Sequence, residues 1–162
     1  MTFTTKIKEE IVATTPDLID ARITLLSYIK FVSTNENDRI HILIENASVA
    51  RYIFKLIKMT YNVDIKLTIR TQKKFKIKKI FILTISKKID IIKSDIEDLV
   101  NNITNSSFEE ISSFLKGAFL SKGSINDPSK SKYHLEFLVD DYNDATLINK
   151  LLLILKFNSK II

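Results

Sequence analysis

Both glycines of the chain, Gly117 and Gly123, fall in one stretch that predicts a helix, a turn and then a strand. Apolar residues at helical spacing and acidic residues near the start indicate the helix. We expect Gly123 to end it with a positive φ, and Asn126-Asp127-Pro128 is typical of a turn. A glycine inside a helix costs about 1 kcal/mol relative to alanine. Gly117 therefore predicts that a second helix approaches closely at that point.

An earlier part of the chain follows the same order of elements. Helix, strand and helix are predicted at 20–33, 39–45 and 47–61, and again at 110–123, 133–139 and 142–157. Asp17 or Asp20, Asn46 or Ser48, and Ser106 or Ser107 are suitable caps for these helices. The repeat predicts two related halves, because each copy would supply the same set of packed elements.

Further elements flank and separate the two copies. Alternating apolar and polar residues predict strands at 63–71 and 74–86, joined by a turn at Gln72 and Lys73. The remaining predictions are a helix within residues 2–15, a polar turn at 34–38 and a helix at 90–102.

The segment Leu115-Lys116-Gly117-Ala118-Phe119-Leu120-Ser121-Lys122-Gly123 resembles the LAGLIDADG helix in its leading leucine, its glycines and its apolar body. The longer string, continued through Asn126-Asp127-Pro128 and Tyr133-His134-Leu135-Glu136, is similar to the bacterial WhiA regulators. The resemblance implies an α+β, LAGLIDADG homing-endonuclease-like pseudo-twofold domain, with two α-β-β-α-type halves and antiparallel sheets. Residues 1–105 would hold the N-terminal region with the first half, and residues 106–162 the second. Gly117 and Gly123 would be structural in such a domain, and Tyr28 and Phe119 would lie in its core.

The second copy ends at Ile162, where the first copy only begins its basic hairpin. We therefore expect the second half to be truncated and the chain to be a fragment. The resemblance implies a further helix-turn-helix domain, which we expect to be absent from this chain.

Nuclease chemistry is not supported by the residues present. LAGLIDADG nucleases carry a metal-binding acid at the eighth motif position, which here would be Val32 and Lys122. Neither side chain binds a divalent metal, and capping or turn roles account for Asp20, Glu109, Glu110 and Asp127. With no cysteine, two separate histidines and no phosphate-binding glycine loop, the sequence predicts no metal, no cofactor and no enzymatic activity.

Positive charge is concentrated in the first half of the chain. Residues 1–90 hold 17 Lys and Arg against 9 Asp and Glu, whereas residues 91–162 hold 8 against 10. Between Lys66 and Lys88 there are nine basic residues and no acid. On the polar faces of the predicted strands, the candidate DNA-binding residues are Arg39, Lys66, Arg70, Lys74, Lys76 and Lys78. The simpler alternative is that these are solvated lysines that keep strand edges from associating.

The resemblance implies a non-catalytic, DNA-binding transcription regulator that acts in cell division or sporulation. Its partners would be double-stranded DNA and other regulatory or division proteins, and its location the cytoplasm, associated with the nucleoid. No apolar run is long enough to suggest a membrane span. Two alternatives remain: a protein-interaction or architectural module whose DNA binding resides in the helix-turn-helix domain, and a residual LAGLIDADG endonuclease.

Overall fold

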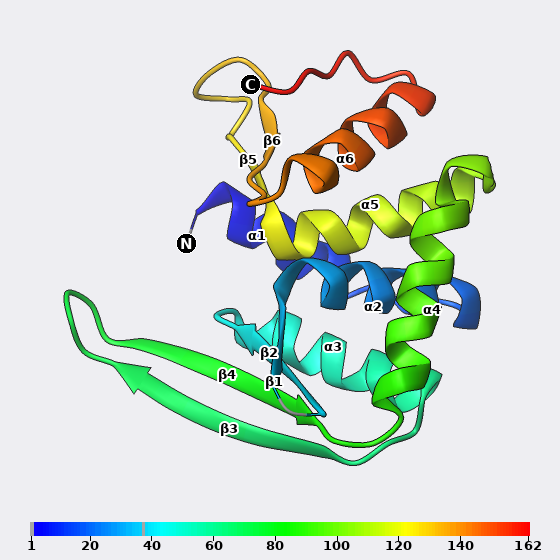
Figure 1. The fold of residues 1–162 in the computed structure, drawn as a ribbon. Coiled ribbons are helices and arrows are strands. Elements are labelled where there is room, and N and C mark those ends of the chain that lie inside the picture. The colour runs from blue at the N-terminus through cyan, green and yellow to red at the C-terminus, as the bar shows by residue number, and fades with distance from the viewer. Residues whose placement is uncertain (1, 37) are drawn as a thin grey trace.

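The computed structural model describes residues 2–36 and 38–162 and shows an α+β fold built from two related halves (Figure 1). Each half starts with a helix that leads directly into a strand, α2 into β1 and α5 into β5. The elements in chain order are α1 (Phe3–Val12), α2 (Leu18–Val32), β1 (Ser33–Glu36), β2 (Arg39–Ile44), α3 (Ala47–Thr60), β3 (Ile65–Gln72), β4 (Lys78–Ile85), α4 (Ile89–Asn102), the 3-10 turn η1 (Ile103–Asn105), α5 (Phe108–Lys122), β5 (Gly123–Ile125), β6 (Leu135–Phe137) and α6 (Tyr142–Ile154).

The first half contains an antiparallel sheet with the strand order β1-β2-β4-β3 and helices on one of its faces. Ile40, Ile42 and Ile44 alternate along β2 and are buried in a core that also includes residues of α2 and α3. Leu83 and Ile85 of β4 join the same core. The strand predicted at 39–45 is therefore confirmed as β2, and its alternation decides which face of the sheet the helices cover.

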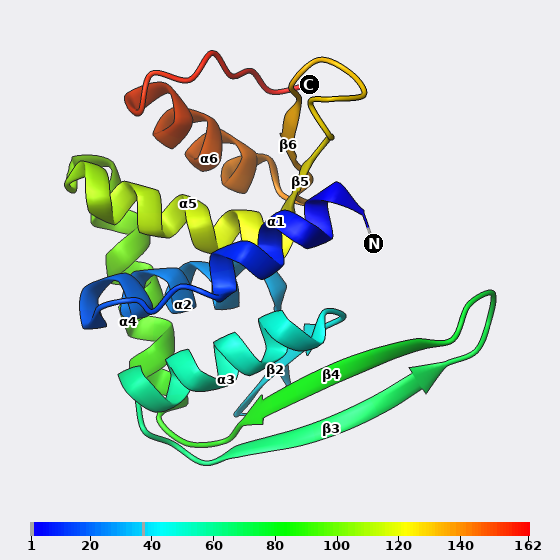
Figure 2. The same cartoon turned by 180° about the vertical axis from the view of Figure 1, so that it is seen from behind.

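Helices α2 and α5 pack side by side and join the two halves (Figures 1 and 2). A Cβ atom on Gly117 would lie 2.5 Å from the backbone oxygen of Thr24 and 2.7 Å from Cβ of Ser27. Ser27 also donates a hydrogen bond of 2.6 Å from its hydroxyl to the backbone oxygen of Phe114. The predicted close approach of a second helix at Gly117 is confirmed.

The second half repeats this arrangement with a smaller sheet. β5 and β6 form a two-stranded antiparallel pair, and α6 packs beside α5. A second core cluster fills this half, and the ring of Phe114 at its centre meets Phe31 of α2 edge to face at 6.1 Å. Both α3 and α6 are followed by a residue with positive φ, Asn62 and Lys156 respectively.

Two local predictions are wrong. The predicted turn at 34–38 contains a strand, because residues 33–36 pair with β2 through backbone hydrogen bonds that need no apolar side chain. Asn37 of that turn lies outside the described residues. The hairpin turn is also displaced, since β3 continues through Gln72 and β4 begins only at Lys78.

Helix α5 ends at Gly123 as predicted, but the positive φ expected there is wrong. Its φ is −91°, a value open to any residue, and it is the first residue of β5. A Cβ atom there would collide with the ring of Phe119 and would lie 2.8 Å from the backbone of the same residue. Lack of space, and not a left-handed backbone, is what requires glycine at this position.

Candidate nucleic-acid interface

The face of the four-stranded sheet that points away from the helices is called the free face here. His41 pairs with Thr84, and Thr84 pairs with Lys66, so these three side chains share that face. A hydrogen bond of 3.0 Å between Nδ1 of His41 and Oγ1 of Thr84 agrees with this register. Strand alternation gives the members of the free face as Thr34, Glu36, Arg39, His41, Leu43, Lys66, Thr68, Arg70, Gln72, Lys78, Ile80, Ile82 and Thr84.

Four of the six candidate DNA-binding residues lie on the free face. Arg39 begins β2, Lys66 and Arg70 lie on β3, and Lys78 begins β4. All four are exposed. The structure thus brings together on one surface basic residues from three strands that the sequence had predicted to share a face.

Lys74 and Lys76 are not on a strand, which corrects the prediction for both. They lie in the loop at residues 73–77 between β3 and β4. The loop is not paired with a neighbouring strand, so alternation does not assign its side chains to the two faces of the sheet. The same loop contains Phe75 and Ile77, which fall within the strand predicted at 74–86. Their exposed fractions are 98% and 77%, because no helix covers this end of the hairpin.

No ion pair between described residues neutralises the cations of the free face. Among the described residues, none of Arg39, Lys66, Arg70 and Lys78 has a carboxylate within ion-pair distance. Glu36 is the register partner of Arg39 on β1, so it supplies a negative charge at that edge of the sheet. The positive potential is therefore concentrated on β3 and β4, where it can attract phosphate groups.

Polar and apolar residues lie between these charges. Thr68 and Gln72 alternate with Lys66 and Arg70 along β3, and all four are exposed. Thr68 and Gln72 were not among the candidate site residues, although their spacing of two from the basic residues was the signal that could have found them. Threonine and glutamine side chains can donate and accept hydrogen bonds at the edges of bases.

The hairpin of β3 and β4 extends beyond the rest of the sheet. The pairing of β2 with β4 stops at Ile44 and Phe81, and past that point β4 pairs with β3 alone. We call residues 70–80 the arm. Figures 1 and 2 show the arm projecting away from the helices, with its loop at the far end.

The eighth positions of the LAGLIDADG-like motifs fall at the ends of α2 and α5. Val32 is the last residue of α2, and Lys122 is the last residue of α5. Within residues 2–36 and 38–162, no cluster of three or more His, Cys, Asp or Glu side chains is suitably placed for a metal ion. The side chains at these helix ends are thus one apolar group and one cation.

A polar network between α2 and α5 was missed by the sequence analysis. Asp20 accepts hydrogen bonds from Lys116 at 2.6 Å, from Ser113 at 2.5 Å and from Thr24 at 3.2 Å. Burial raises the pKa of Asp20, but the hydrogen bonds and the charge of Lys116 outweigh it, so its pKa lies below the usual value. Asp17 provides the helix cap instead, through a hydrogen bond from the backbone N–H of Asp20.

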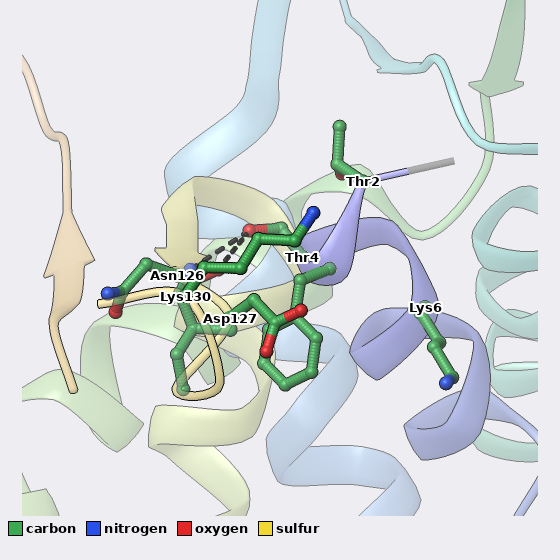
Figure 3. A pocket seen from close by; sticks show the side chains of 8 residues that line it. Thr2, Thr4, Lys6, Asn126, Asp127 and Lys130 are labelled. Carbon is green, nitrogen blue, oxygen red and sulfur yellow. Dashed lines mark hydrogen bonds between the residues drawn. The ribbon is translucent and has the colours of Figure 1, made fainter. Parts of the chain in front are cut away.

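Helix α1 connects the two halves near the ends of α2 and α5. The hydroxyl of Thr4 donates to the backbone oxygen of Ile125 in β5 and accepts from its N–H, both at 2.9 Å (Figure 3). An open hollow of about 460 Å³ lies beside this contact, between the start of α1 and the turn that includes Asp127. Its wide opening makes it a junction between elements and not an enclosed ligand site.

Two models of one protein family match the sequence. The WhiA N-terminal LAGLIDADG-like domain matches residues 21–99, and the WhiA LAGLIDADG-like domain matches residues 111–162. Between them they cover most of the chain.

Curated relatives carry the name "Probable cell division protein WhiA". The protein of Staphylococcus saprophyticus is 31% identical over 99% of this chain and 55% of its own length. The protein of Staphylococcus aureus strain JH9 is 29% identical with the same coverage. The chain therefore spans about half the length of the curated relatives that it matches.

Solved structures share the fold. The N-terminal LAGLIDADG domain of a WhiA protein has a TM-score of 0.76 and 24% identity, over 99% of this chain and 78% of that one. Full-length WhiA, described as from Thermatoga maritima, has a TM-score of 0.70 and 24% identity, over 94% of this chain and 50% of that one. I-DmoI, solved in complex with DNA and Mn, has a TM-score of 0.53 and 17% identity, over 86% of this chain and 79% of that one.

Across the part of the chain that the structure describes, every helix is too short or too polar to cross a membrane. The predicted fold class is confirmed by the antiparallel sheets, by the paired helices and by the similarity to solved LAGLIDADG domains. With both halves matched by models of one family and with relatives of that name aligned along its length, the chain belongs to the WhiA family.

Proposed function

We propose that the chain is a non-catalytic, DNA-binding part of a regulator of cell division, and that its free face lies along duplex DNA. The observation that carries this proposal is that three cations of β3 and β4, Lys66, Arg70 and Lys78, are exposed on the same face of the sheet and have no ion-pair partner among the described residues. Phosphate contacts by such side chains release counterions, which gives affinity without sequence selectivity. Arg70, Thr68 and Gln72 would add hydrogen bonds to base edges.

Solved structures with a similar fold support the proposal that the partner is DNA. I-DmoI was solved in complex with DNA, once with Mn and once with Ca. Because its fold is similar to that of this chain, the similarity supports the free face of the sheet as the surface that contacts duplex DNA. Transcription control, sporulation and association with the nucleoid belong to the same proposal.

Absence of catalysis is also part of the proposal. Val32 and Lys122 at the two helix ends offer no carboxylate to hold a divalent cation beside a scissile phosphate. Incubation with supercoiled plasmid and magnesium should leave the plasmid uncut. Nicking that depends on magnesium would instead favour the endonuclease alternative.

The deciding experiment is duplex binding measured by fluorescence anisotropy over a range of salt concentrations. We compare the protein with a free-face variant, Lys66→Gln, Arg70→Gln and Lys78→Gln. A matched control variant, Lys93→Gln, Lys150→Gln and Lys160→Gln, removes the same charge from exposed residues outside the sheet. The log–log salt slope should fall by roughly one for each lost phosphate contact in the free-face variant, and much less in the control.

Two results would contradict this assignment. Equal losses in both variants would mean that net charge alone attracts DNA. Absence of binding by the folded, unaltered protein would favour the alternative of a protein-interaction module.

A further inference from the structure

The loop at the end of the arm combines exposed apolar residues with cations. Phe75 is 98% exposed and Ile77 is 77% exposed, so neither side chain contributes to the core. The flanking lysines are exposed too and have no ion-pair partner among the described residues. They are Lys73, Lys74, Lys76, Lys78 and Lys79. An exposed aromatic ring between cations is typical of a surface that meets a ligand with both anionic and apolar parts.

Duplex DNA and a lipid surface both have that composition, and the placement of the loop favours DNA. The loop is continuous with the free face through Arg70 and Lys66 of the same hairpin. A long polyanion can contact the loop and the free face together, whereas a flat membrane surface would meet the projecting tip alone (Figure 1).

The apolar side chains then indicate which part of the duplex the loop contacts. Phosphates offer nothing to a phenyl ring, and in the major groove the ring could contact only the methyl group of thymine, because it has no hydrogen-bonding group with which to read base edges. Its complementary surface is the face of a base. Apolar side chains reach base faces from the minor groove, where they insert between neighbouring base pairs and kink the duplex.

We propose that residues 73–77 form a wedge in which Phe75 enters the minor groove and partly unstacks one base step. Lys74 and Lys76 contact the phosphates on either side of the insertion, and Ile77 covers the exposed edge of the separated bases. The inference rests on the proposed function, because the free face brings the duplex within reach of the arm. It adds a deformation of DNA that an electrostatic surface alone does not produce.

The chain contains no tryptophan, which permits a direct test. Phe75→Trp places a single indole at the tip, and Phe108→Trp places one at an exposed phenylalanine at the start of α5, outside the sheet. Stacking on bases should quench the indole of the Phe75→Trp variant when duplex is added and should shield it from acrylamide. The Phe108→Trp control should keep its emission.

A second measurement uses end-labelled duplex and energy transfer between the two ends. The unaltered protein should shorten the end-to-end distance, since an inserted wedge bends DNA by about 20–90°. Phe75→Ser should lower affinity about tenfold, the size of one base–aromatic stack, and leave the salt slope unchanged. Phe75→Leu should keep part of the bend, and the control Phe108→Ser should keep all of it.

The outcomes separate the two proposals. Salt-dependent binding without quenching of the indole in Phe75→Trp and without bending overturns the wedge and leaves the free face as the contact surface. No binding to duplex overturns both. A blue shift of the Phe75→Trp emission with anionic phosphatidylserine vesicles, without quenching by duplex, overturns the wedge in favour of a lipid contact.

Discussion

Lys116 Nζ in α5 lies 2.6 Å from Oδ2 of Asp20 in α2, so an ion pair joins the two helices at the centre of the fold. The two side chains are only 21% and 25% exposed. Ser113 and Thr24 donate further hydrogen bonds to the same carboxylate. A carboxylate held in this way stabilises the packing of α2 against α5 only while it stays ionised and every donor keeps its partner.

Asp20→Asn should destabilise the protein at neutral pH by about 1.5–3 kcal/mol, the range for a hydrogen bond to a charged group. The variant leaves the ammonium of Lys116 without its counter-charge at a site with little access to water. Urea unfolding at pH 7 measures the change. Asp64→Asn is the matched control, because Asp64 is 88% exposed and its contact with Lys87 is long, at 3.8 Å; that variant should unfold almost as the unaltered protein does.

The same pair predicts a dependence of stability on pH. The pKa of Asp20 is lowered in the folded protein, so its contribution is complete above the unfolded value of about 3.9 and is lost as pH falls through the folded pKa. The stability difference between the protein and Asp20→Asn should therefore be constant above about pH 5 and shrink below about pH 4. A difference that stays constant down to about pH 2 would contradict this assignment.

Gly117→Ala should destabilise the protein by about 1–3 kcal/mol or more, as overpacking does in a tight core. Helix propensity alone predicts the opposite sign, because alanine is the better helix former. The sign of the stability change is decided by the backbone oxygen of Thr24, which cannot move away from the added methyl group without displacing α2. Thermal unfolding should show the loss, and Ser112→Ala on the exposed side of α5 should show none. A raised melting temperature for Gly117→Ala would refute the close packing.

Gly123→Ala should also destabilise the protein, and a change in Phe119 should relieve it. The added methyl group meets the ring of Phe119, whereas φ at this position suits any residue. The cost of Gly123→Ala should thus be smaller in a Phe119→Leu background, which a double-mutant cycle measures by urea unfolding. Strict additivity would point to the backbone of Phe119 as the obstacle. Gly123→Asn should do no better than alanine, since asparagine helps only where φ is positive.

The helices were predictable because their signals are local. Asp17, Asn46 and Ser107 accept from backbone N–H groups at the starts of α2, α3 and α5, and the sequence offered each of them as a cap. β1 carried no such signal, since its side chains are polar and its partner is supplied by the fold. The contact of Asp20 with Lys116 spans 96 positions and could not be found from spacing.

The site prediction was likewise correct only where a local sequence pattern matched the contacts that the fold supplies. Alternation correctly placed Lys66, Arg70 and Lys78 on one face, because their strands are paired along that length. It failed at Phe75 and Ile77, where lysines and apolar residues still alternate but no second layer exists to bury one side. Alternation alone does not show where the hairpin turns, because Leu67 and Ile69 of β3 are exposed as well. The contact of these residues with DNA stays a prediction.

Two threonines on β3 can test which face of the sheet contacts the duplex. Thr68 and Thr71 are both exposed on β3, and the register places Thr68 on the free face and Thr71 on the opposite side. Each is changed to glutamate, so net charge and local strand propensity change alike. Thr68→Glu should weaken duplex binding by about tenfold or more, because a carboxylate beside a phosphate is repelled.

Thr71→Glu should weaken binding much less at the same ionic strength, since its carboxylate projects from the side that faces away from the duplex. Anisotropy titrations at two salt concentrations measure both variants, and raising the salt should reduce the difference between them. Circular dichroism and urea unfolding serve as the folding control for each. Equal losses would mean that the duplex contacts the edge of the arm and not the free face, and a larger loss for Thr71→Glu would reverse the assignment of the faces.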